Sequence, residues 1–229
     1  MEILNVLKPI HITAGAFALM SGVVAMTSKK GQQPHRLSGK IFFWSMAVTC
    51  VLGLNAGIFR PGLLLFIPIA LISFYQVASG YRILYIKNLH KGQKPEWIDW
   101  LLTIGMTITT IGFIGWGIVS LQEDIFLSIV LFAFSTIGMY CCGMDLYHYI
   151  KKPTDKNYWL FIHIFRMSHG YIAALTAFLV NNSKLFKFVP QVALLIIPIS
   201  IGQPIITYII WTYRRKKDKT EPVVAEAKI

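Results

Sequence analysis

The chain has 229 residues, of which 55% are hydrophobic and only 14% are charged. This composition excludes an ordinary soluble domain and an intrinsically disordered chain. A formal net charge of +12 would suggest a nucleic-acid partner in a soluble protein, but here the lysines and arginines lie between long apolar runs. We therefore expect the lipid bilayer as partner and no nucleic acid.

Seven apolar segments follow one another along the chain. A hydrocarbon core about 30 Å thick needs roughly 20 apolar residues per helix, and each segment has about this length. The segments are 9–27, 36–58, 62–86, 99–120, 125–149, 158–181 and 188–213. The breaks between them are short and contain the Pro, Gly and charged residues that end helices. The sequence therefore predicts an all-α polytopic transmembrane bundle with seven spans, forming one domain over residues 1–213.

The basic residues are distributed unequally between alternate breaks. One set of breaks, together with the carboxyl-terminal tail, holds 17 of the 22 lysines and arginines, and the opposite set holds four. The excess lies around 29–40, 82–94, 151–156 and in the tail 214–229. Because basic loops stay in the cytoplasm, this pattern predicts an outside amino terminus and a basic cytoplasmic tail. The expected location is the inner membrane of a bacterium.

Several ionisable side chains lie inside the predicted spans. A charged group at the bilayer centre costs about 2.5 to 3.5 kcal/mol on insertion scales, so such groups face other helices and form pairs. Asp145 and Arg166 lie at depths that permit an ion pair. His11 shares a helix face with small residues that allow close helix packing. His163 and His169 are six residues apart and point in different directions, so they do not chelate one metal ion from one face.

These histidines suggest a haem b site. A haem that bridges two transmembrane helices needs two imidazoles from different helices, with small residues nearby to admit the macrocycle. The first candidate pair is His11 with His169, and the second is His35 with His163, nearer the cytoplasmic face. Arg166 or a basic loop residue would pair with the propionates. The function expected from this site is electron transfer with a redox partner that the sequence does not name.

Two other functions compete with the haem hypothesis. Asp145, His148 and His163 could form a zinc site that activates water in an intramembrane hydrolase acting on a small-molecule substrate. Alternatively, Asp145, Arg166 and the histidines could relay protons or line a polar cavity in a transporter or sensor. Prolines inside the predicted spans are compatible with broken transporter helices but are common in other membrane proteins.

Two resemblances follow from particular motifs. The pattern His11-x3-Gly15-x3-Leu19-x2-Gly22, with Pro34-His35-Arg36-x2-Gly39 and His163-x2-Arg166-Met167, resembles a bacterial family of predicted multi-pass membrane proteins of unknown function. The resemblance implies that these histidines and Arg166 are motif positions.

A local resemblance concerns residues 35–61, which are similar to one helix of the di-haem transmembrane b-type cytochromes that pass electrons from ascorbate. It implies that His35 is a haem ligand. The sequence departs from that family because it lacks a set of four histidines in four consecutive central helices.

Overall fold

The computed structural model describes residues 2–220, so Met1 and the end of the predicted tail, 221–229, lie outside the described residues. The described residues form helices and no strand, which confirms the all-α prediction. The α-helices are α1 Glu2–Thr27, α2 Gln33–Phe59, α3 Phe66–Arg82, α4 Trp97–Ser120, α5 Ile125–Lys151, α6 Tyr158–Asn181 and α7 Gln191–Thr220. Short 3-10 turns are η1 Pro61–Leu63, η2 Leu89–Lys91 and η3 Ser183–Leu185.

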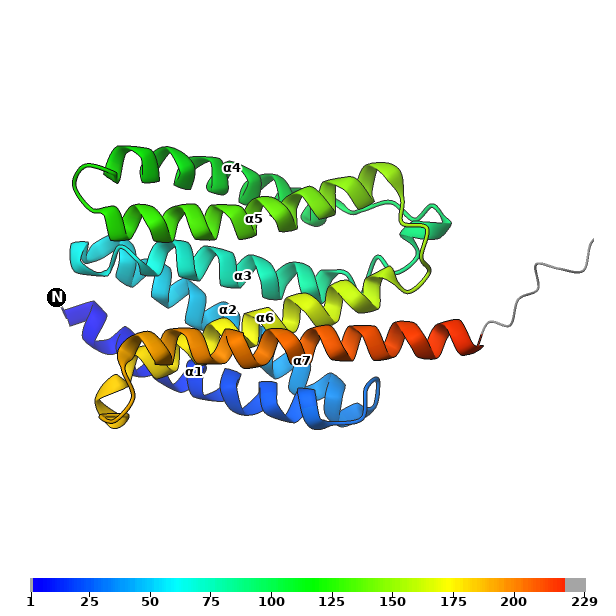
Figure 1. The fold of residues 1–229 in the computed structure, drawn as a ribbon, viewed down its shortest axis with the longest axis horizontal. Coiled ribbons are helices and arrows are strands. Elements are labelled where there is room, and N and C mark those ends of the chain that lie inside the picture. Colours follow the sequence, from blue (N-terminus) through cyan, green and yellow to red (C-terminus); the bar gives the residue numbers. More distant parts are fainter. Residues whose placement is uncertain (1, 221–229) are drawn as a thin grey trace, which may run out of the picture. The chain divides into compact units, whose positions relative to one another are not determined.

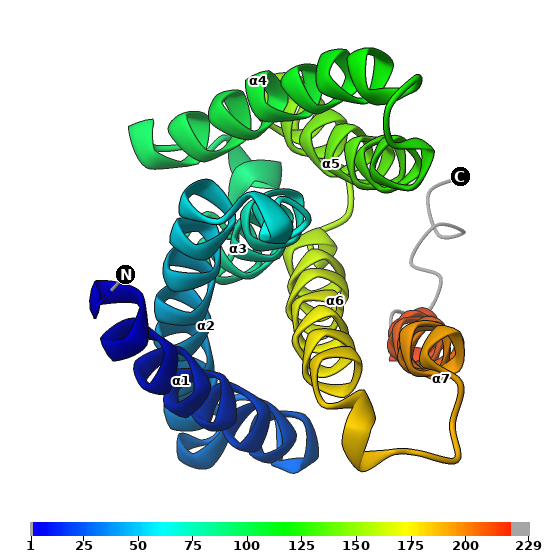
Figure 2. The ribbon, with the colours of Figure 1, turned by 90° about the vertical axis from the view of Figure 1, so that its left-hand side faces the viewer.

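The chain divides into two compact units at Leu175 and Thr176, within α6. In the first unit α1 packs against α2 and α4 packs against α5, while α3 contacts α2 on one side and both α4 and α5 on the other. Figures 1 and 2 show α3 at the middle of this unit, between the two helix pairs. Within this unit, successive helices from α1 to α6 run in opposite directions (Figure 1). The ends of α1, α3 and α5 therefore meet the starts of α2, α4 and α6.

We call this end of the first unit the basic end, because its connections carry most of the lysines between the helices. They are Lys29, Lys30, Lys87, Lys91, Lys94, Lys152 and Lys156. The start of α4 is fixed here by a capping box, in which Glu96 accepts from the backbone of Asp99 and Asp99 accepts from the backbone N–H of Glu96 at 2.9 Å. Such reciprocal bonds satisfy N–H groups that have no partner inside the helix.

Apolar side chains form the core of the first unit and also cover its outside. One cluster between α3, α4 and α5 contains Ile72, Met106 and Leu131, and another joins α1, α2 and α3. Large apolar side chains also point outward, such as Trp44 at 66% and Val119 at 76% exposure. Outward apolar faces on all-helical elements are typical of proteins surrounded by lipid, where each helix satisfies its own backbone hydrogen bonds.

Five helices of residues 2–220 are long and apolar enough to cross a membrane. They are Leu7–Thr27, Gln33–Phe59, Trp97–Ser120, Ile125–Lys151 and Val192–Arg215. The other two of the seven predicted spans form shorter or more polar helices. The α3 helix has only 17 residues, and α6 carries His163, Arg166 and His169. The lengths and composition are those of an integral membrane protein.

The second unit contains the end of α6, η3 and α7. The α7 helix has 30 residues, with Pro198 and Pro204 inside it. It continues to Thr220, so the first residues of the predicted basic tail, from Arg214, belong to this helix.

Candidate functional site

The structure brings together one of the two predicted histidine pairs. His35 lies in the first turn of α2 and His163 in the second turn of α6, both at the basic end. The centroids of their imidazole rings are 6.4 Å apart, and the ring planes are inclined at 79°. Two residues that are 128 positions apart in the sequence therefore form one site.

The ring of His35 is held by the end of α1. Its Nδ1 lies 2.9 Å from the carbonyl oxygen of Ala25. Because α1 ends at Thr27, this carbonyl is among the last four of the helix, which have no intrahelical donor. Since a carbonyl accepts only, Nδ1 carries the proton in this contact, and Nε2 is the ring nitrogen without a proton in the neutral imidazole.

The ring of His163 is held in the same manner by the end of α3. Its Nδ1 lies 2.8 Å from the carbonyl oxygen of Gly80. The N–H of Leu84 donates to Tyr81 instead, at 3.2 Å, as α3 changes to a turn, which leaves the Gly80 carbonyl for the imidazole. Both histidines thus donate from Nδ1 to a helix-terminal carbonyl, an arrangement that fixes the tautomer and orientation of metal-ligating histidines.

The distance between the rings distinguishes two kinds of metal coordination. A metal–imidazole bond is about 2.0 to 2.1 Å long and the ring nitrogen lies about 1.1 Å from the ring centroid, so two imidazoles on opposite sides of one metal ion have centroids about 6.3 Å apart. Two tetrahedral ligands would bring the centroids to about 5 Å. The observed 6.4 Å is close to the first of these separations, so the spacing of the two rings would allow both imidazoles to hold one metal ion.

The surroundings of the histidine pair are basic. Lys30 and Lys87 lie close enough to act electrostatically on His163, and burial lowers the pKa of the Lys30 ammonium group in the connection after α1. A side chain at Gly39, one turn after His35, would meet no heavy atom within 4 Å. A planar cofactor with acidic substituents would find cationic groups here.

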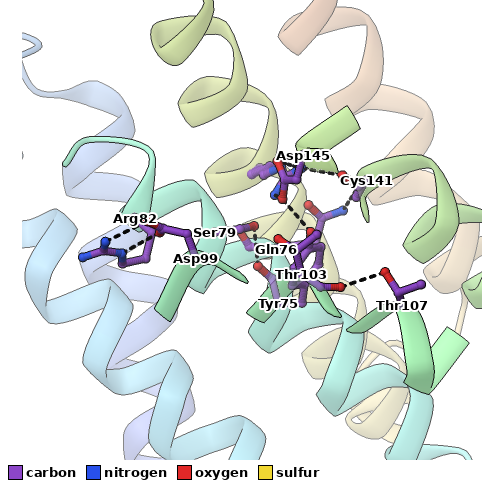
Figure 3. Close-up of polar contacts among 10 residues, drawn as sticks. Tyr75, Gln76, Ser79, Arg82, Asp99, Thr103, Thr107, Cys141 and Asp145 are labelled. Atoms are coloured by element: carbon purple, nitrogen blue, oxygen red, sulfur yellow. Dashed lines mark hydrogen bonds and ion pairs between the residues drawn. The ribbon is translucent and has the colours of Figure 1, made fainter. Parts of the chain in front are cut away.

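The predicted pair of Asp145 and Arg166 is confirmed. Arg166 Nη1 and Nη2 donate to the two carboxylate oxygens of Asp145 at 2.7 and 2.8 Å, and both side chains are only 3% exposed. Nη2 also donates to the carbonyl of Cys141 at 2.9 Å, and Tyr75 Oη donates to Asp145 at 2.5 Å. Figure 3 shows Asp145 and Cys141 of α5 next to Tyr75 and Gln76 of α3. We call these residues, with Arg166, the buried polar cluster.

One glycine, Gly80, lies against both the buried polar cluster and the histidine pair. A Cβ atom at Gly80 would be 2.8 Å from the Cβ of Arg166 and 3.3 Å from the backbone nitrogen of Met167. Only a glycine therefore fits where α3 crosses α6, and its carbonyl is the partner of His163. Asp145 and Cys141 hold Arg166, so the candidate partners for acidic substituents at the histidine pair are Lys30 and Lys87 of the nearby connections. In the structure Lys30 Nζ donates to the carbonyls of Ala25 and Met26 at 3.1 and 2.5 Å, and Lys87 Nζ lies 4.5 Å from the centroid of the Trp159 ring, so either ammonium group would have to change partner.

The remaining predicted histidines lie in different surroundings. His11 packs against α2, where its Cε1 is 3.8 Å from the Cβ position of Gly53. His169 Nδ1 bonds to the carbonyl of Phe165 on its own helix at 2.7 Å, and the two rings are 4.0 Å apart. His148 lies between the rings of Tyr147 and Tyr158, at 5.7 and 5.6 Å.

The residues of the zinc hypothesis, Asp145, His148 and His163, have separate partners. Both oxygens of Asp145 accept hydrogen bonds from Arg166, whereas His163 faces His35 and Gly80. Over residues 2–220, no three His, Cys, Asp or Glu side chains form a group that could hold a metal ion. The Asp145 carboxylate is therefore bound to the Arg166 guanidinium group and is not available as a metal ligand.

Sequence reasoning missed a second ion pair and the polar residues of α3. Arg82 Nε and Nη2 donate to Asp99 at 2.8 and 3.0 Å (Figure 3), and Nη2 donates to Glu96 at 2.9 Å. This pair was detectable, because opposite charges at the end of one span and the start of the next meet in an antiparallel bundle. Tyr75 and Gln76 could not be recognised in this way. Neither side chain is charged, and single aromatic or amide residues are found in membrane spans without a polar partner.

Comparison with known proteins adds no relative: no family model, curated protein or solved structure matches this chain.

Proposed function

We propose that the protein is a membrane electron carrier in which His35 and His163 would hold a haem b. The observation that supports this proposal best is the histidine pair itself, with ring centroids 6.4 Å apart and each Nδ1 bonded to a helix-terminal carbonyl. Both Nε2 atoms are then left as ligands. A bound haem b supplies a one-electron redox couple.

The chain's own residues have three tasks in this proposal. The carbonyls of Ala25 and Gly80 orient the two imidazoles and keep Nδ1 protonated. Lys30 and Lys87 offer positive charge to the propionates, as charge-assisted hydrogen bonds require. Both histidines are half-buried, which limits the access of water to their rings, and solvent access is one of the factors that set the potential of a haem.

The test is an absorption spectrum of the purified protein after expression with sufficient haem. We expect a Soret band and, after reduction with dithionite, the sharp visible bands of a six-coordinate haem b. His35→Ala and His163→Ala should each lose these bands. His90→Ala is the matched control, because His90 belongs to η2, where its Nδ1 contacts the carbonyl of Lys87.

Two results would contradict the proposal. If the wild-type protein lacks a Soret band, the electron-carrier function is wrong. If His35→Ala and His163→Ala keep the six-coordinate spectrum while His11→Ala and His169→Ala lose it, the haem binds at the other histidine pair.

We also propose that all seven helices cross a bacterial inner membrane, with the amino terminus outside and the basic end in the cytoplasm. The excess of lysine and arginine at the basic end supports this orientation. For α6, the pairing of Arg166 with Asp145 removes much of the cost of placing a guanidinium in the bilayer. In α3, which has 17 residues, the η1 turn before it and the turn after it extend the segment toward both membrane surfaces.

A further inference from the structure

The buried polar cluster is incompletely hydrogen-bonded. Within residues 2–220, three buried side-chain atoms have no hydrogen-bond partner, namely Gln76 Oε1, Thr103 Oγ1 and His148 Nδ1. Buried polar atoms in proteins are nearly always bonded to protein or to ordered water, because an unpaired one costs free energy. The unpartnered atoms of Gln76 and His148 therefore indicate additional hydrogen-bonding molecules.

One of these atoms, Gln76 Oε1, belongs to the buried polar cluster itself. Its side chain is only 4% exposed, and its Nε2 lies 3.5 Å from the sulfur of Cys141, whose carbonyl accepts from Arg166. Its neighbour Tyr75 donates to Asp145. Figure 3 shows the Gln76 amide between Cys141 and Tyr75. Rotating the amide by 180° exchanges its oxygen and nitrogen, so one of the two atoms would still need a partner.

The second atom, His148 Nδ1, lies on α5 between the buried polar cluster and the basic end. It follows Asp145 by three residues, which puts both on one side of α5, and it interacts electrostatically with both Asp145 and Arg166. The helix ends three residues later, at Lys151, and the preceding Tyr147 is 54% exposed. A path from His148 to the surface is therefore one turn long, whereas the opposite end of α5 is more than 20 residues away.

We propose that the buried polar cluster is a hydrated site, in which water bound by Gln76 Oε1 and His148 Nδ1 connects the Asp145–Arg166 pair with the aqueous phase at the basic end. The ligand is water, which can donate to the Gln76 oxygen and either donate to or accept from the imidazole. Such a chain of hydrogen bonds conducts protons to the buried pair. This inference does not depend on haem binding and goes beyond the proposed electron transfer.

The native cysteines allow a direct test by hydrogen–deuterium exchange of their thiols, followed by the infrared S–H stretch. Cys141 adjoins the proposed water through Gln76 and is 2% exposed, whereas Cys50 is 7% exposed and lies in the apolar cluster of Ala18, Phe42, Met46, Ala70 and Val77. Two single-cysteine proteins are compared in D2O, one with Cys50→Ala and Cys142→Ala and the other with Cys141→Ala and Cys142→Ala. We expect the Cys141 thiol to exchange at least tenfold faster than the Cys50 thiol.

Two further variants remove the proposed partners of the water. Gln76→Leu and His148→Phe should each slow exchange of Cys141 at least tenfold, and His90→Phe should leave it unchanged. The two variants act on different helices, so a folding defect in one leaves the other informative. The proposal is overturned if Cys141 exchanges as slowly as Cys50, or if neither variant slows it. Haem binding is measured separately by the Soret band, so the two proposals fail independently.

Discussion

At the scale of single residues, the free energy of unfolding of the protein depends strongly on the Asp145–Arg166 pair. Removing one partner of a buried, hydrogen-bonded ion pair costs about 3 to 5 kcal/mol, because the other charge stays buried without compensation. We expect Asp145→Asn to lower the free energy of unfolding by about this amount. Combining it with Arg166→Gln should restore part of the loss, since both charges are then absent. Denaturant unfolding in detergent, followed by circular dichroism, measures the effect.

The second ion pair provides the control. Glu96 also contacts an arginine, but its side chain is 58% exposed, and exposed salt bridges contribute about 0 to 1 kcal/mol. Glu96→Gln should therefore change the free energy of unfolding by less than 1 kcal/mol. If Asp145→Asn and Glu96→Gln lower the free energy of unfolding equally, the buried Asp145–Arg166 pair stabilises the protein no more than an exposed pair does, and the prediction is wrong.

At the scale of helices, the contact between α3 and α6 depends on glycine. A Cβ atom at Gly170 would lie 2.4 Å from Cγ2 of Val77, a residue buried in the core. Gly170→Ala should destabilise the protein by about 1 to 3 kcal/mol, the usual cost of overpacking. Val77→Ala removes the clashing methyl group and should recover part of this loss in the double variant. Gly143→Ala, where a Cβ meets no atom within 4 Å, is the control and should not destabilise the protein. Thermal unfolding compares these four variants with the wild-type protein.

The helices were predicted well from the sequence. Apolar runs of membrane length mark the helices, and the Pro, Gly and charged residues between these runs mark where the helices end. The bounds of α3 were predicted too widely, at 62–86 instead of Phe66–Arg82, since apolar residues in the flanking turns have the same hydropathy as helical ones. The Asp145–Arg166 pair was predictable from depth alone. The proximity of His35 and His163 was not predictable, because their ring positions depend on the carbonyls of Ala25 and Gly80, which accept from side chains where α1 and α3 end.

At the scale of the whole molecule, the distribution of charge separates two topologies. If α3 and α6 lay outside the bilayer and only the five most apolar helices crossed it, the connections 83–96 and 152–157 would lie outside the cell. Seven basic residues would then be on the wrong side, namely Arg82, Lys87, Lys91, Lys94, Lys151, Lys152 and Lys156. Since basic residues in short loops remain in the cytoplasm, we expect seven crossings.

Labelling of single cysteines in intact cells with a membrane-impermeant maleimide tests this expectation. The background lacks the native cysteines through Cys50→Ala, Cys141→Ala and Cys142→Ala. With seven crossings, Gln122→Cys should be labelled and Thr154→Cys should not, whereas five crossings predict the reverse for both. Phe188→Cys and Gln32→Cys are controls, because both topologies place the first outside and the second inside. Labelling of Thr154→Cys together with protection of Gln122→Cys would place the histidine pair's α6 helix outside the bilayer, and the expectation of seven spans would be wrong.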